Sequence, residues 1–187
     1  MLTIDFEASC LPRDGRSFPI EVAVADLDGN CRSWLIAPAP AWNGWTWTEE
    51  AEALHGLRRD QLVRDGQRPE QVMRELNAVV AGRRVIADHH LDQRWLATLA
   101  EASGIAPSFR IGHVSELLDV HCPSAGTLER ATAKADLLVS KRHRAAADAR
   151  WLAIVARDLI VAAEAQAAPL FAWSGANTSL QKLPSAA

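Results

Sequence analysis

The sequence has few cysteines, no long apolar run and no excess of basic residues, and each shortage excludes a class of protein. Cys10, Cys31 and Cys122 are too few for a disulfide scaffold, and no two of them have the CxxC spacing of a metal or redox site. No window approaches the roughly 18 uncharged apolar residues of a membrane-spanning helix. The formal net charge of −3 excludes a broadly basic nucleic-acid coat.

What the chain does contain is the composition of an ordinary globular protein. Its 187 residues, 49% hydrophobic and 23% charged, fit one domain with a substantial core and exclude a disordered or collagen-like chain. The unpaired cysteines indicate free thiols in a reducing compartment. Asp5 and Glu7 place charge where a secretory segment would be apolar. We therefore expect a cytoplasmic protein that makes no contact with a membrane.

Hydrophobic periodicity predicts strands first and alternating helices and strands afterwards. An antiparallel meander is expected over residues 1–6, 18–27 and 31–37. Helices are expected over residues 48–54, 58–64, 69–81, 89–103, 127–138 and 145–167, with short strands over 83–87 and 109–114. Thr48, Asp88 and Thr127 are the predicted N-caps, and Gly104 is a predicted helix end. We expect an α/β fold, a mixed sheet flanked by helices, over residues 1–168, with an irregular tail over 169–187.

Two of the predicted helices begin their apolar face with an aspartate. Asp148 precedes the stripe that starts at Trp151, and Asp92 precedes the stripe that starts at Trp95. A carboxylate on this face points into the protein or a cleft, where it needs a cation or several hydrogen-bond donors. The alternative is an ordinary helix-start aspartate favoured by the helix dipole.

The first predicted strand adds two more carboxylates. Asp5 and Glu7 are two positions apart, so their side chains leave the same face of the strand. Side by side they repel each other unless a cation lies between them, and Mg²⁺ prefers such oxygen ligands. The alternative is a solvated polar face.

His143 completes the candidate site if it lies on the loop before the last helix. From that place it could act as a general base on a water molecule. Alone it would be an ordinary surface histidine. Together, four carboxylates and one histidine indicate phosphoryl chemistry assisted by two metal ions.

In their order and spacing these residues resemble the motifs of the DEDDh class of 3′–5′ exonucleases, the DnaQ-like branch of the ribonuclease H-like fold. The matching segments are Ile4-Asp5-Phe6-Glu7, Asp92-Gln93-Arg94-Trp95-Leu96, and His143 through Asp148, with a weaker echo at His55-Gly56. The resemblance covers about residues 2–165. Ala8-Ser9-Cys10 and Ala87-Asp88-His89 depart from the family pattern (Thr-Thr-Gly and His-Asn-Ala), which leaves the substrate preference open.

The resemblance implies an activity and a role for each residue. Asp5, Glu7, Asp92 and Asp148 would bind two Mg²⁺ or Mn²⁺ ions, and His143 would deprotonate the attacking water. The substrate would be the 3′ end of single-stranded DNA or RNA, and the product a nucleoside 5′-monophosphate. Expected substrate contacts are Phe6, Ala8, His55 and Arg144. The resemblance also allows a homodimer.

Two other functions stay open at this point. One is an inactive nucleic-acid-binding or interaction module on the same fold, and the other is a metal-dependent phosphohydrolase that acts on nucleotides. Trp42, Trp45 and Trp47 could stack on unpaired bases, but packing within a loop or at an interface is favoured.

Overall fold

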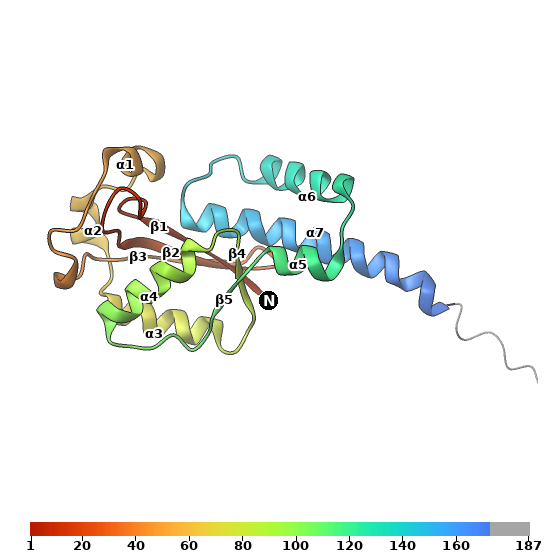
Figure 1. The fold of residues 1–187 in the computed structure, drawn as a ribbon, viewed down its shortest axis with the longest axis horizontal. Helices are drawn as coiled ribbons and strands as arrows, with labels where there is room; N and C mark the ends of the chain where they lie inside the picture. The colour runs from red at the N-terminus through yellow and green to blue at the C-terminus, as the bar shows by residue number, and fades with distance from the viewer. Residues whose placement is uncertain (173–187) are drawn as a thin grey trace, which may run out of the picture.

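The computed structural model describes residues 1–172 and the side chains of residues 1–166, and it contains one five-stranded sheet (Figure 1). The strands lie in the order β3-β2-β1-β4-β5. They are β1 (Leu2–Ala8), β2 (Pro19–Asp26), β3 (Cys31–Leu35), β4 (Val85–Ala87) and β5 (Ile111–His113). The first three form an antiparallel meander, whereas β4 and β5 join parallel to β1. This mixed sheet confirms the predicted fold class.

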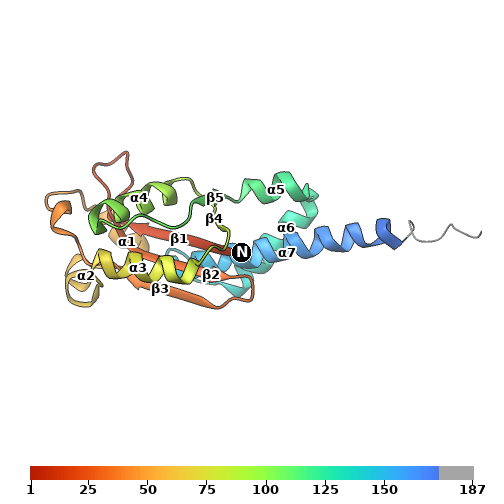
Figure 2. The ribbon, with the colours of Figure 1, turned by 90° about the horizontal axis from the view of Figure 1, so that it is seen from below.

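Helices cover both faces of the sheet (Figures 1 and 2). Helices α3 and α4 lie on one face, and α7, with α6 beside it, lies on the other. Helices α1 and α2 lie at one end of the sheet, and α7 extends beyond the opposite end. The helices are α1 (Glu49–His55), α2 (Arg59–Asp65), α3 (Pro69–Val80), α4 (Leu91–Ser103), α5 (Ser115–His121), α6 (Ala125–Leu138) and α7 (Ala145–Ala172), with a 3₁₀ turn η1 (Pro40–Trp42).

Small side chains let α7 approach the sheet closely. Ala23 and Ala25 of β2 pack against Ala145, Ala149 and Ala153 of the helix. The hydroxyl of Thr3 on β1 donates a hydrogen bond of 2.6 Å to the backbone carbonyl of Ala149. The face of β1 that carries Thr3 also carries Asp5 and Glu7, so the two carboxylates face the N-terminal end of α7.

The large core lies on the other face of β1. Leu2, Ile4 and Phe6 alternate with the polar residues of the strand and pack into a cluster that includes Trp95 and Leu96 of α4. β1 is therefore buried on both faces, by large apolar side chains under α4 and by alanines under α7. The alternation predicted for the first strand is confirmed.

Two of the predicted helix ends are confirmed and two are wrong. Thr48 caps α1 by accepting the amide of Ala51, and Gly104 ends α4 with φ +65°. Asp88 does not cap α4, which starts after His90 without a side-chain cap. Ser124, three residues before Thr127, caps α6 by accepting the amide of Thr127, so α6 begins earlier than its apolar stripe suggests.

Two segments differ from the expected architecture. Helix α5 occupies a stretch with no predicted element, and it lacks a side-chain cap that could have indicated it. Helix α7 continues to Ala172, so residues 169–172 are helical where an irregular tail was expected. The rest of that tail, 173–187, lies outside the described residues. Among the described residues, no helix combines the length and apolarity needed to cross a bilayer.

The tryptophan-rich loop packs on the chain itself. Trp42 is buried and stacks on Phe18, with ring centroids 5.2 Å apart. The guanidinium of Arg16 lies 4.2 Å from the ring centre of Trp45, and the indole N–H of Trp47 donates to Glu52 at 2.7 Å. The packing interpretation is confirmed, and the aromatic rings are largely occupied by these neighbours.

Candidate active site

Three of the predicted carboxylates meet where β1 passes the start of α7. Asp5, Glu7 and Asp148 each offer an oxygen atom, and these three atoms lie within 4.8 Å of one another. Asp148 is only 8% exposed, as its place at the head of an apolar stripe predicted. The sequence separates Asp148 from Asp5 by most of the chain, and the close packing of α7 on the sheet brings them together.

The fourth carboxylate reaches the same strand from the opposite helical layer. Asp92, in the first turn of α4, is 2% exposed, and its Oδ1 accepts the backbone N–H of Phe6 at 3.0 Å. β4 pairs with β1 only at Leu2 and Thr3. The amide of Phe6 lies beyond that ladder, and Asp92 takes the place of a strand partner. The inward orientation predicted for Asp92 is confirmed.

The electrostatics of this cluster suit a divalent cation. Burial, followed by the charge of Asp148, raises the pKa of Glu7 to about 8. Burial and Asp92 raise the pKa of Asp5 well above its usual range, and burial and Asp88 raise the pKa of Asp92 to about 7. Near neutral pH, such groups lose their protons together only when positive charge compensates them. Clustered carboxylate oxygens are the donors that Mg²⁺ and Mn²⁺ prefer, so the residues fit these ions.

His143 lies on the loop that precedes α7, as predicted. Its backbone N–H donates to Oδ2 of Asp148 at 2.7 Å, and the amide of Arg144 donates to the same oxygen at 3.1 Å. The residue has φ +66°, a left-handed conformation that a non-glycine residue adopts at a cost. Its side chain is exposed. Asp148 thus holds the backbone of the loop that carries the proposed base.

The two arginines beside His143 are each paired with a carboxylate. The guanidinium of Arg142 contacts Oδ1 of Asp148 and lies 4.2 Å from the ring centre of Trp151. Arg144 donates to both carboxylate oxygens of Glu21, at 2.9 and 2.7 Å. Both guanidinium groups are therefore held by carboxylates of the fold. A contact between Arg144 and substrate stays a prediction, since the structure gives its guanidinium to Glu21.

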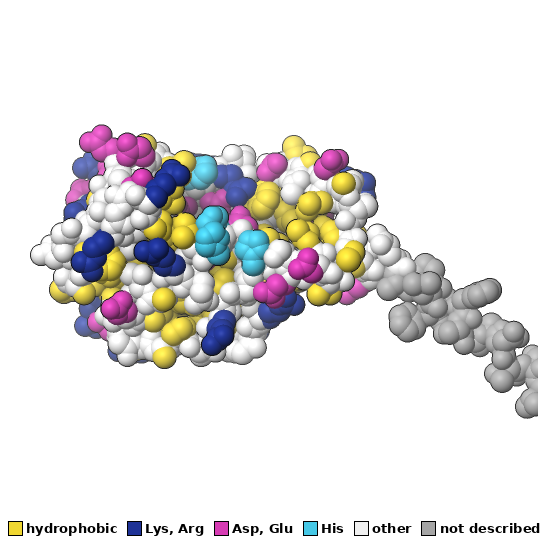
Figure 3. Space-filling view, viewed as in Figure 1, with side chains coloured by type: hydrophobic (Ala, Val, Ile, Leu, Met, Phe, Trp, Pro, Cys, Tyr) yellow, Lys and Arg dark blue, Asp and Glu magenta, His cyan; other side chains and the backbone are white. Residues whose placement is uncertain are grey.

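A cavity of about 620 Å³ opens beside the carboxylates. Glu7 and three of the predicted substrate contacts, Phe6, Ala8 and His55, are among its lining residues. Leu11 and Leu54 give it exposed apolar walls. Figure 3 shows acidic side chains at the base of a hollow between the surfaces over α1 and α6, with histidine side chains along its border.

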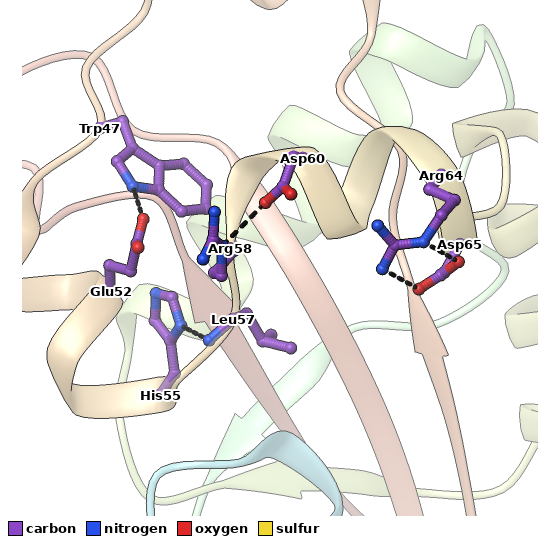
Figure 4. A network of polar contacts seen from close by, with 8 residues as sticks. All are labelled: Trp47, Glu52, His55, Leu57, Arg58, Asp60, Arg64 and Asp65. Atoms are coloured by element: carbon purple, nitrogen blue, oxygen red, sulfur yellow. Dashed lines mark hydrogen bonds and ion pairs between the residues drawn. The ribbon is translucent and has the colours of Figure 1, made fainter.

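His55 lines this cavity and carries one buried ring nitrogen that has no hydrogen-bond partner. Its Nδ1 accepts the backbone N–H of Leu57 at 2.9 Å (Figure 4), and its buried Nε2 has no partner. Burial lowers the pKa of His55 to about 4, so the ring is neutral near pH 7. With Nδ1 as the acceptor, the proton of the neutral ring is on Nε2.

Three residues near the site have roles that were not predicted from the sequence. Glu21 and Arg142 hold the loop at His143, and Asp88, exposed at the end of β4, adds to the negative potential at Asp92. The sequence carries a signal for Glu21, an acid inside the otherwise apolar run of the second strand. Arg142 gives no such signal, because loop arginines are usually solvated.

No family model matches the chain, and no curated protein matches it. Solved structures do match its fold. One is a 3′-exonuclease from a study of 3′-end-specific recognition of a histone mRNA stem-loop, with a TM-score of 0.62, 14% identity and coverage of 86% of this chain and 81% of that chain.

Exonuclease I is a second structural relative. The enzyme from Methylocaldum szegediense gives a TM-score of 0.64 at 17% identity, covering 91% of this chain and 42% of that one. The E. coli enzyme in complex with a dT13 oligonucleotide gives 0.62 at 14% identity, covering 92% and 42%. The chain thus spans less than half the length of exonuclease I. The likeness confirms the expected fold, the ribonuclease H-like fold that DnaQ-like 3′-exonucleases and exonuclease I share.

Proposed function

We propose that this protein is a metal-dependent 3′–5′ exonuclease that degrades single-stranded nucleic acid to nucleoside 5′-monophosphates in the cytoplasm. The observation that carries the proposal is the set of three carboxylate oxygens, of Asp5, Glu7 and Asp148, within 4.8 Å of one another beside a nucleotide-sized cavity. The exonuclease folds that match the chain support it.

Each residue has a distinct part in the proposed reaction. Asp5, Glu7 and Asp148 would hold two Mg²⁺ or Mn²⁺ ions, with Asp92 as the fourth carboxylate. When bound, such ions lower the pKa of an attacking water and stabilise charge on the phosphate and the leaving oxygen. His143, exposed on the loop beside Asp148, would accept the proton of that water.

The cavity would hold the terminal nucleoside of the strand. Leu11 and Leu54 offer apolar surface to a base, and contacts of this kind tolerate every base because each has a flat face. An unpaired 3′ end fits such a cavity because its last nucleotide is free to leave the stack.

The test is degradation of matched 5′-labelled single-stranded DNA and RNA oligomers in Mg²⁺, in Mn²⁺ and in EDTA. We expect a ladder that shortens from the 3′ end in the presence of metal and no products in EDTA. Asp148→Asn, which keeps the size of the ligand and removes its charge, is the matched inactive control. The ratio of the DNA and RNA rates then identifies the preferred substrate.

Three outcomes would contradict the proposal. Binding of oligomers by folded wild-type protein without cleavage in any metal would identify an inactive module. Hydrolysis of free nucleotides in preference to oligomers would identify a nucleotide phosphohydrolase. Degradation of a 3′-blocked oligomer from its 5′ end would show that the assigned polarity is wrong.

A further inference from the structure

Glu21 is a buried acid with no part in the reaction described above. It lies on β2, is 3% exposed and stands directly across from Glu7 in the antiparallel pairing of β1 and β2. Two like charges at directly opposed positions destabilise a sheet unless something compensates them. A carboxylate at this position therefore destabilises the folded protein unless other contacts compensate it.

All the contacts of the Glu21 carboxylate go to the junction between the His143 loop and α7. Its Oε2 accepts Nε of Arg144 at 2.9 Å, and its Oε1 accepts Nη2 of the same side chain at 2.7 Å. Its Oε2 also accepts the backbone N–H of Ala145, the first residue of α7, at 3.0 Å. The carboxylate thus forms a bidentate ion pair and caps the helix, which are both strong forms of hydrogen bonding to a charged group.

These contacts fix Arg144 and Ala145 to strand β2, which is a rigid element of the sheet. β2 is a central strand of the sheet, hydrogen-bonded to β1 and β3 along its length. The residues anchored by Glu21 directly follow His143 and directly precede the helical turn that presents Asp148. The helix dipole favours a negative charge at this end of α7, so the carboxylate also stabilises the first turn.

We propose that Glu21 is a positioning residue for the hydrolysis proposed above, on which this inference rests. Through Arg144 and the amide of Ala145, it holds the His143 loop and the start of α7 in register with β1. Asp148 then meets Asp5 and Glu7, and His143 stays beside them. Glu21 touches neither substrate nor the reacting atoms in this assignment.

The decisive variant is Glu21→Gln, which keeps the size of the side chain but cannot form the charged bidentate pair. We expect kcat to fall roughly 10- to 100-fold, the range of a misplaced catalytic group, with KM changed less than about threefold. Arg144→Gln should lower kcat similarly, and the double variant should be no worse than either single one. Glu75→Gln is the matched control, because Glu75 on α3 also bonds an arginine, Arg32, away from the site.

Hydrogen exchange separates this inference from the proposed activity. In Glu21→Gln the amides of His143, Arg144 and Ala145 should exchange faster, while those of β1 and β2 stay protected and Glu75→Gln changes none of them. If wild-type protein proves inactive, the exchange data still test the anchor.

Two results would overturn the inference. The first is an unchanged kcat with unchanged exchange at the loop, and the second is a rise in KM alone, which would make the pair a substrate-binding element. Should Glu21→Gln fail to fold, Arg144→Gln removes the same ion pair from its half-exposed side and serves in its place.

Discussion

The carboxylates of Asp5 and Glu7 can lie side by side only if protons or cations neutralise them. Their raised pKa values show that the folded protein resists ionising both. This cost is expected where a site is built to bind cations, because binding then recovers the energy of the repulsion. A single carboxylate removed from the cluster should therefore affect stability and activity in opposite directions.

Asp5→Asn should abolish turnover and stabilise the metal-free protein. Loss of a cation ligand removes several kcal/mol of transition-state stabilisation, which corresponds to a loss on the order of 10³-fold or more. At about pH 8 in EDTA, the melting temperature should rise by a few degrees because a costly buried charge is gone. Calorimetry and the oligomer assay measure the two effects. Wild-type turnover in this variant would disprove the assignment of Asp5.

His143→Ala should separate proton transfer from cation binding. The side chain is exposed and makes no described hydrogen bond, so its removal should leave folding and Mn²⁺ affinity unchanged. The rate should fall about 10²- to 10⁴-fold, the usual contribution of a general base. Calorimetric titration with Mn²⁺ beside the oligomer assay gives both quantities. A variant that loses cation affinity would show that His143 supports the site instead.

At the scale of single elements, the loop before α7 carries Arg142, whose positive charge partly neutralises the carboxylate of Asp148. Arg142 contacts Oδ1 of Asp148, a side chain that is a candidate cation ligand, and it stacks on Trp151 of α7. A cation at Asp148 therefore competes with the guanidinium. Helix α7 presents both the ligand and the aromatic surface on which the competing arginine lies.

Arg142→Gln should increase affinity for Mn²⁺. The Arg142 side chain is 33% exposed and that of Asp148 is 9% exposed. Removing a partly exposed ion pair of this kind is worth about 1 kcal/mol, so we expect tighter binding by about fivefold. Lys141→Gln is the control, because it removes the same charge from an exposed neighbour. Titration calorimetry and the quenching of Trp fluorescence on addition of Mn²⁺ test this. Equal affinities in the two variants would rule out competition at Asp148.

Elements with a strong hydrophobic periodicity could be predicted from the sequence. The residues from distant segments that pair with them could not. The alternation of β1 and the stripes behind Asp92 and Asp148 show which side chains face inward, because each is a property of one segment. The pairing of Glu21 with Arg144 joins positions 123 residues apart, and no local pattern encodes it. Helix α5 was not predicted, although α2, which has the same length and also lacks a side-chain cap, was.

At the scale of the whole molecule, the site should make metal-free stability fall as pH rises. The pKa of Glu7 is about 8 in the folded protein and near its ordinary 4.5 when unfolded. Between these values the folded state binds more protons, so each increase in pH favours the unfolded state. Urea denaturation in EDTA should therefore give a free energy of unfolding that decreases from about pH 4.5 to about pH 8. Above about pH 8, Glu7 should contribute little further change.

Two comparisons check this assignment. Glu7→Gln should flatten much of the slope, and Mg²⁺ should restore stability most at the alkaline end, where its ligands are already charged. A wild-type profile that rises across the same range would show that other groups dominate.

The fold and the candidate site could thus be expected from the order of five residues, whereas the cavity and the loop anchors required the structure. Phe6, Ala8 and His55 line one cavity because strand β1 ends where α1 begins to cover it, a relation that depends on tertiary packing. The resemblance to exonucleases predicted these residues as substrate contacts but not their position in one cavity.

The central place of β1 has a consequence for synthesis of the chain. β1 is made before α7, so its carboxylates gain Asp148 only after α7 has been made and has docked. Closing so long a loop is slow and entropically costly, so a nascent or truncated chain that ends before α7 holds an incomplete set of ligands. The proposed hydrolysis would then require a docked α7, and a chain without this helix would carry uncompensated carboxylates on β1 instead of a complete set of ligands.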